Sequence, residues 1–268
     1  MDWQLIPVFV AIGCVVGFLA GLLGIGGAIT LIPLLTVIFA HEHFPANHVV
    51  HMAVATSLAT IVFTSISSTR AHAQRGAVLW PVVLGLTPGI LVGSLIGPQI
   101  VAGMSSALLA AVFALFAGTS AAQMLLYKKP KATRQLPGRA GLLGVGLVLG
   151  VLSSMVGAGG GFLSVPFMTW SNVRIHNAVA TSAAVGFPIA AAGTVGYIIA
   201  GSRQEGLPPY TLGYIYLPAL VAIVIASMLM APIGVRVSHG LPVLRLRRVF
   251  AGLLLAIAAF MLWKAATY

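Results

Sequence analysis

The sequence predicts an all-α polytopic membrane protein built from two inverted-topology repeats of about five helical segments each, with broken or half helices at the centre. Three observations lead to this fold class. Apolar residues make up 59% of the 268 residues and charged residues only 6%, against about 25% charged in soluble domains. Apolar stretches long enough to span a bilayer recur along the whole chain. A glycine-rich stretch also occurs twice, at residues 17–33 and 150–166.

Ten apolar segments divide evenly between the two halves. The first five are expected at approximately 4–23, 27–40, 49–69, 78–98 and 105–127. The second five are expected at approximately 140–157, 160–172, 177–200, 210–233 and 246–266. The second segment of each set has about 13 residues and covers only about 20 Å of a core about 30 Å thick. We expect these two to be half-helices, and whether they span or re-enter places the number of membrane helices between about eight and ten.

Further sequence matches indicate an internal duplication. Residues 51–57 match residues 176–182 at six of seven positions, and residues 112–114 match residues 249–251. We therefore expect a first transmembrane repeat at 1–127, a basic cytoplasmic linker at 128–139 and a second transmembrane repeat at 140–268. Because five segments is an odd number, the repeats are expected to insert with opposite orientation.

Positive charge predicts the orientation of the chain. The linker 128–139 carries five Lys and Arg, which places it in the cytoplasm by the positive-inside rule. Alternation from there puts Asp2, Glu42 and Glu205 outside, together with both termini. We therefore expect a multi-pass protein of the inner (plasma) membrane with periplasmic or extracellular termini. The net charge of +11 does not indicate a nucleic-acid partner, because Lys and Arg lie at segment ends and not among exposed aromatic residues.

Each glycine-rich stretch interrupts an apolar segment just before a short helix. Glycine weakens a helix, and unwound backbone is tolerated in a bilayer only against protein or a water-filled cavity. Breaks at corresponding places in two halves are typical of a transporter's binding site. The first turn of each half-helix has unpaired N–H groups and the positive end of the helix dipole, which suit an anion. The alternative is close helix packing through small residues.

The candidate substrate-binding residues are the breaks, the first half-helix residues and two repeated Thr-Ser pairs. They are Gly24, Gly26, Gly27, Ala28, Ile29, Thr56, Ser57, Gly157, Gly159, Gly160, Gly161, Phe162, Thr181 and Ser182. The Thr and Ser hydroxyls could donate to anion oxygens, or they could bond to the carbonyl one turn earlier. The matched His51 and His176 are candidates for gating or a proton relay, with interfacial caps as the alternative.

The sequence lacks the residues that several other functions need. No Asp or Glu lies within an apolar segment, which argues against a cation carrier. The chain has no Walker glycine-lysine signature and no set of protease residues, so we expect no enzyme. His41, His43 and His48 share a loop with Glu42, but their spacing fits no defined metal site. We expect no metal and no cofactor.

The doubled glycine motif resembles a known family. The pattern Gly-x-x-x-Gly-x-x-Gly-x-Gly-Gly ends on Pro33 and Pro166, and Ala-x-Ala-Thr-Ser follows each copy. It is similar to the TauE/SafE sulfite exporter family, also called the toluene-sulfonate uptake permease family. The second copy departs from the pattern, with Ser154 where the first has Gly21, so the helix crossing there is expected to differ. The resemblance implies a bacterial inner-membrane carrier for sulfite, sulfonates or related small oxyanions, often driven by the proton gradient.

The two lines agree on a secondary transporter of a small oxyanion, working by alternating access in the lipid bilayer. Proton coupling would need His51 or His176, a protonated substrate such as bisulfite, or would be absent. A passive anion channel or facilitator with the same fold is the nearest alternative, and a non-transporting membrane scaffold is the next. Substrate, direction, coupling ion and oligomeric state stay open at this point.

Overall fold

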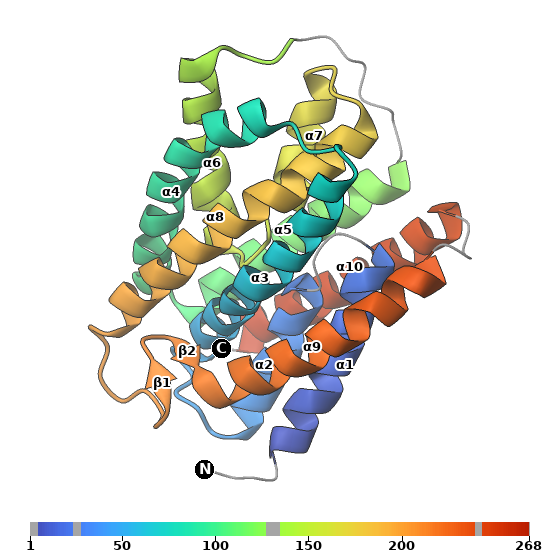
Figure 1. Ribbon diagram of the computed structural model, residues 1–268. Helices are drawn as coiled ribbons and strands as arrows, with labels where there is room; N and C mark the ends of the chain where they lie inside the picture. Colours follow the sequence, from blue (N-terminus) through green and yellow to red (C-terminus); the bar gives the residue numbers. More distant parts are fainter. Residues whose placement is uncertain (1–4, 24–27, 127–134, 239–242, 268) are drawn as a thin grey trace.

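The computed structural model describes residues 5–23, 28–126, 135–238 and 243–267. The described residues form ten helices and one small hairpin (Figure 1). The helices are α1 (Leu5–Leu23), α2 (Ala28–His41), α3 (Val49–Gln74), α4 (Trp80–Ala102), α5 (Ser106–Leu126), α6 (Arg139–Met155), α7 (Gly161–Trp170), α8 (Ile175–Gly201), α9 (Leu217–Ser238) and α10 (Val243–Thr267). Each expected segment is helical, and the all-α polytopic fold is confirmed.

Four helical stretches in the described part of the chain are long and apolar enough to cross a membrane. They are Val49–Gln74, Trp80–Ala102, Ser106–Gln123 and Ile175–Gly201. A helix suits the bilayer core because it pairs its own backbone N–H and C=O groups, and no water is present there to pair them. The helices α2 and α7 have only 14 and 10 residues, which confirms the expected short segments.

Three expected boundaries were wrong by five residues or more, one of them the end of α9 at Ser238 instead of residue 233. The segment expected at 210–233 becomes helical only at Leu217, because an antiparallel hairpin, β1 (Thr211–Leu212) and β2 (Ile215–Tyr216), precedes it. Tyr210 and Gly213 have φ values of 65° and 58°, and this left-handed backbone does not continue a helix. Conversely, α3 continues to Gln74 instead of ending near residue 69. Its last turn is largely exposed, so hydropathy marked the end of the apolar stretch and not the end of the helix.

Helices from the two halves of the sequence interlock. The helix α1 packs along α9, and α6 packs along α4 (Figure 1). In addition, α5 packs against α10 and α3 against α8. If α1–α5 correspond to α6–α10, a twofold axis exchanges the first two pairs and maps each of the last two onto itself. This pattern supports the proposed division into two inverted repeats.

Glycines bring α6 close to α4. A methyl group added at Gly146 would overlap the carbonyl oxygen of Leu86, and one added at Gly150 would lie 2.6 Å from the carbonyl oxygen of Ile90. The two backbones are therefore in direct contact, as small residues permit between membrane helices. No larger side chain fits at either position without separating the helices.

The pair α1–α9 is built in the same way. A methyl group at Gly13 would lie 2.9 Å from the Ile223 carbonyl oxygen, and one at Gly17 would meet the Ser227 backbone. Gly13 and Gly17 precede their counterparts on α6 by the same 133 residues that separate the glycine-rich stretches. The duplication is therefore visible in packing as well as in sequence.

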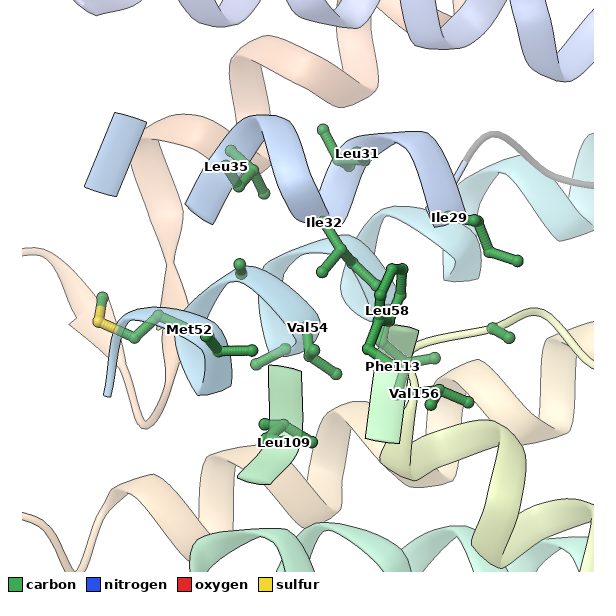
Figure 2. Packing of buried hydrophobic residues seen from close by; sticks show 14 of the residues in the cluster. Ile29, Leu31, Ile32, Leu35, Met52, Val54, Leu58, Leu109, Phe113 and Val156 are labelled. Carbon is green, nitrogen blue, oxygen red and sulfur yellow. The ribbon is translucent and has the colours of Figure 1, made fainter. Parts of the chain in front are cut away.

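Buried apolar side chains form two clusters. The smaller one joins α4, α6, α7 and α8, and the larger one chiefly joins α1, α2, α3, α5, α9, α10 and the hairpin. Each cluster takes helices from both halves, so neither half has a core of its own. Figure 2 shows part of the larger cluster, where Ile32 from α2, Leu58 from α3 and Phe113 from α5 lie near Val156. Val156 follows α6 directly, so this cluster reaches the second glycine break.

Candidate functional site

The second glycine break is a helix end followed by a new helix start. The Gly157 N–H donates to the Ser154 carbonyl at 3.4 Å, and the Ala158 N–H donates to the Ser153 carbonyl at 2.9 Å. Gly157 has a φ of 61°. These two bonds around a left-handed glycine form a Schellman motif, which closes α6 and pairs its last carbonyls. The chain then turns and restarts as α7.

The start of α7 has no side-chain cap. Gly160 precedes the helix with a φ of 78° and provides no side chain to cap the first turn. The first N–H groups of a helix have no partner within it, and they carry the positive end of the dipole. Gly161 and Phe162 are the first two residues of α7, so their N–H groups are the donors at this position.

Helices α3 and α8 surround the break. A methyl group added at Gly159 would lie 3.4 Å from Ile61 Cγ2 on α3, and one added at Gly160 would lie 2.6 Å from Ile189 Cδ1 on α8. On the same side of α8, a methyl group added at Gly186 would lie 2.9 Å from the Gly159 carbonyl oxygen. These neighbours are apolar or carry no side chain, so the backbone N–H groups supply the positive potential here.

A serine pair links the first turn of α7 to α8. The Ser164 Oγ lies 2.8 Å from the Gly160 carbonyl oxygen and 2.7 Å from the Ser182 Oγ. Both residues are buried. Sequence reasoning selected Ser182 and missed Ser164. The missed signal was a hydroxyl residue one turn after the break, on the helix that packs against α8.

The first break lies partly outside the described residues. Gly24, Gly26 and Gly27 belong to the undescribed segment 24–27, Ala28 begins α2, and Ile29 is buried in the larger cluster. One turn further along α2, Ile32 reaches the second break. A methyl group added at Gly157 would lie 2.9 Å from Ile32 Cδ1. The first half-helix therefore contacts the break that precedes the second one.

The matched threonines each bind the start of a helix in the opposite repeat. The Tyr216 N–H donates to the Thr56 Oγ1 at 3.1 Å, immediately before α9. The Leu79 N–H donates to the Thr181 Oγ1 at 3.0 Å, immediately before α4. Both threonines are completely buried. A side-chain oxygen that accepts from a helix start satisfies one of its orphan donors. Sequence reasoning did not foresee this role, and the oxygen can accept this bond while the O–H still donates elsewhere.

Replacing either threonine with valine should destabilise the protein. Val has nearly the same shape but leaves an N–H unpaired, buried at Tyr216 and partly buried at Leu79, and such a loss costs about 1–3 kcal/mol when the N–H is buried. We expect Thr56→Val and Thr181→Val to lower the unfolding free energy by similar amounts, and Thr→Ser to retain most of it. Thermal unfolding in detergent measures this, with the exposed Thr119→Val as the control. Unchanged unfolding in both valine variants would show that these bonds do not hold the repeats together.

The remaining predicted residues have unequal environments. Ser57 is completely buried on α3, next to Thr56. The matched histidines differ strongly, because His51 is only 1% exposed whereas His176 lies exposed at the start of α8. The His51 Nε2 lies 2.9 Å from the Val101 carbonyl oxygen at the end of α4. Identical sequence context has therefore produced a buried histidine in one repeat and a surface histidine in the other.

Comparison with known protein families identifies the family of this chain. The sequence profile of the sulfite exporter TauE/SafE family matches residues 9–261. The chain belongs to the TauE/SafE sulfite exporter family. The match extends from α1 into α10, so both breaks and both Thr-Ser pairs lie within the TauE/SafE region.

Relatives of this TauE/SafE member are named as transporters. A probable membrane transporter protein of Haemophilus influenzae is 33% identical over 255 residues, which is 94% of this chain and 96% of the relative. One from Methanocaldococcus jannaschii is 28% identical over 96% of both chains. One from Bacillus subtilis is 31% identical over 84% of this chain and 87% of the relative. No solved structure matches the chain. Membership of the TauE/SafE family thus supports membrane transport as the general function.

Proposed function

We propose that this chain is a secondary transporter that moves a small oxyanion across the inner membrane by alternating access. Sulfite and short organosulfonates are the leading candidates, in line with the name of the TauE/SafE family. The observation that carries the proposal is the start of α7. It lies between α3 and α8 with no side-chain cap, and a buried serine pair adjoins it.

Backbone N–H groups would hold the anion. The Gly161 and Phe162 N–H groups and the positive helix end attract negative charge without a buried cation. The apolar neighbours Ile61 and Ile189 keep water away and strengthen this electrostatic attraction. A compact oxyanion suits such a site, because its several oxygens can accept hydrogen bonds from more than one N–H group.

Ser182 is the side-chain donor in this proposal. Ser164 has one O–H, but two acceptors lie within reach, the Gly160 carbonyl and the Ser182 Oγ. When Ser164 donates to Gly160, Ser182 donates to Ser164. When Ser164 donates to Ser182, the Ser182 O–H is released for another acceptor. An arriving anion would favour the second arrangement, and the change requires only rotation of two hydroxyl groups.

Thermal stabilisation of the purified protein by small anions tests the proposal. A panel of sulfite, sulfate, thiosulfate, short sulfonates and short carboxylates is suitable. A ligand at about 100 times its Kd should stabilise the protein by about 2.7 kcal/mol. We expect one class of sulfur oxyanion to stabilise the wild type and Ser182→Ala to lose most of the effect. Ser202→Ala, at an exposed site after α8, is the matched control. A flat response to every anion would contradict the proposal.

The packing of the centre favours a carrier over a passive channel. Ile32 fills the space next to Gly157, and Leu58 and Phe113 are completely buried nearby. Passage of an ion past these side chains requires the helices to rearrange, as in alternating access. Counterflow in proteoliposomes separates the two mechanisms. A carrier loaded with unlabelled anion inside accumulates labelled anion transiently, whereas a channel does not.

A further inference from the structure

The hairpin between α8 and α9 places two tyrosines in the protein interior. Tyr214 is completely buried and Tyr216 is 5% exposed, while Tyr210 and Leu212 beside them are exposed. The corresponding connection in the first repeat, residues 75–79, has no strand and no tyrosine. The hairpin therefore belongs to one face of the molecule only, the face where α2 ends and α3 begins (Figure 1).

Tyr216 joins an aromatic cluster at that face. Its ring packs edge-on against Phe9, Phe39 and Phe44, with centroid distances of 6.1, 5.7 and 5.2 Å. Its N–H donates to the Thr56 Oγ1. These contacts connect the hairpin to α1, α2, the loop after α2 and α3. With the hairpin docked in this position, the aromatic cluster covers the last turn of α2 and the first turns of α3.

Tyr214 stacks on His51, and the hydrogen bond of His51 to the Val101 carbonyl fixes which ring nitrogen carries the hydrogen. The rings of Tyr214 and His51 stack with centroids 5.4 Å apart and an interplanar angle of 28°. The His51 Nε2 lies 2.9 Å from the Val101 carbonyl oxygen. A carbonyl only accepts, so the hydrogen is on Nε2 and the Nδ1 of neutral His51 carries a lone pair. This Nδ1 is the proton-accepting atom of the cluster.

The polar atoms around this stack lack partners. His51 Nδ1, His48 Nδ1 and the Tyr214 hydroxyl are buried, and none has a hydrogen-bond partner among the residues that the structure describes. The titratable groups that face the stack are His48 at the start of α3, Tyr214 on the hairpin and Tyr197 on α8. No carboxylate among the described residues acts on His51. A positive charge created here would therefore be buried without a counter-ion, which is strongly unfavourable.

Protonation of His48, which lies just before α3, also opposes docking of the hairpin. Burial lowers the pKa of His48 below its ordinary value of 6.5. A base with a lower pKa in the docked form binds fewer protons there than when it is exposed. Docking therefore loses stability as the pH falls through about 6.5 and keeps it at higher pH.

We propose that the hairpin is a gate on this face, closed by Tyr214 stacked on neutral His51 and opened by a proton that binds the His51 Nδ1. The protonated ring needs water or a counter-ion, and the hairpin must lift for water to reach it. Lifting breaks the Tyr214 stack, the Tyr216 contacts and the bond to Thr56 together. The matched His176 is exposed and has no part in the gate. This inference does not depend on which anion is carried.

Hydrogen exchange of the hairpin amides in the full-length protein tests the gate. The Tyr216 N–H is bonded to Thr56 and the Tyr214 N–H to Tyr197, so both are protected while the hairpin is docked. After correction for the intrinsic rate, we expect protection of the 207–219 peptide to fall about tenfold between about pH 8 and about pH 5.5. Mass spectrometry of the purified wild type makes this measurement without any substitution.

Variants then assign the effect to one residue. His51→Gln can still donate to the Val101 carbonyl but does not titrate, so most of the pH dependence of protection should disappear and only the part that His48 contributes should remain. His176→Gln, at the matched position of the other repeat, should behave as the wild type. Constant protection in the wild type would overturn the gate, whether or not the variant folds. Loss of the pH dependence in His48→Gln but not in His51→Gln would overturn the assignment to His51.

Discussion

A Gly93→Val variant should lose more stability than any other single change that we consider. A methyl group added at Gly93 would overlap the Leu147 carbonyl oxygen and lie 2.9 Å from the Val151 backbone nitrogen. Backbone atoms of a helix cannot turn aside as a side chain does, so α4 and α6 would have to separate. We expect a loss of about 3 kcal/mol or more in unfolding free energy, measured by thermal unfolding in detergent.

The control lies on the facing helix. Gly144 is an exposed residue of α6, and no atom from the described part of the chain outside its own helix turn lies within 4 Å of an added methyl group, so Gly144→Val should leave unfolding almost unchanged. Both variants replace a helical glycine with the same residue, and they differ only in what the new side chain meets. Equal stability of the two variants would show that α4 and α6 do not approach as closely as described.

The helices and the second glycine break could be predicted because their causes are local. An apolar stretch in a bilayer forms a helix wherever it is long enough, since its backbone has no other partner. Glycines stop such a helix within a few residues, as Gly157 and Gly160 do between α6 and α7. The internal repeat gave each predicted feature a counterpart in the other half of the chain. The packing of α1 on α9 and of α6 on α4 agrees with this repeat.

Other parts of the site depend on contacts that the sequence does not contain. Thr56 and Thr181 accept from residues 160 and 102 positions away, so no local pattern indicates the bonds. Ser164 joins the site only because α7 packs on α8. The hairpin, which lacks a counterpart in the first repeat, makes His51 different from His176 although their surrounding sequences match. Each of these features required the arrangement of the helices.

Gly160→Ala should weaken anion binding and transport more than any other change at the candidate site. Alanine in the left-handed region costs about 1–2 kcal/mol, and the new methyl group would lie 2.6 Å from Ile189 Cδ1. Relief of both effects turns the first N–H groups of α7 away from their present direction. We expect anion affinity at least about tenfold weaker, equivalent to about 1.4 kcal/mol, in thermal-shift titration, and a matching loss of flux in proteoliposomes.

Gly206→Ala separates the site from backbone strain in general. Gly206 has a φ of 77°, nearly the same as the 78° of Gly160, but among the described residues nothing lies within 4 Å of its added methyl group. The two variants therefore carry the same conformational cost, and only Gly160→Ala disturbs the start of α7. If both lose affinity equally, the loss reflects overall stability. If Gly160→Ala binds as the wild type does, the first turn of α7 does not hold the anion. Loss in Gly160→Ala alone identifies that turn as the binding site.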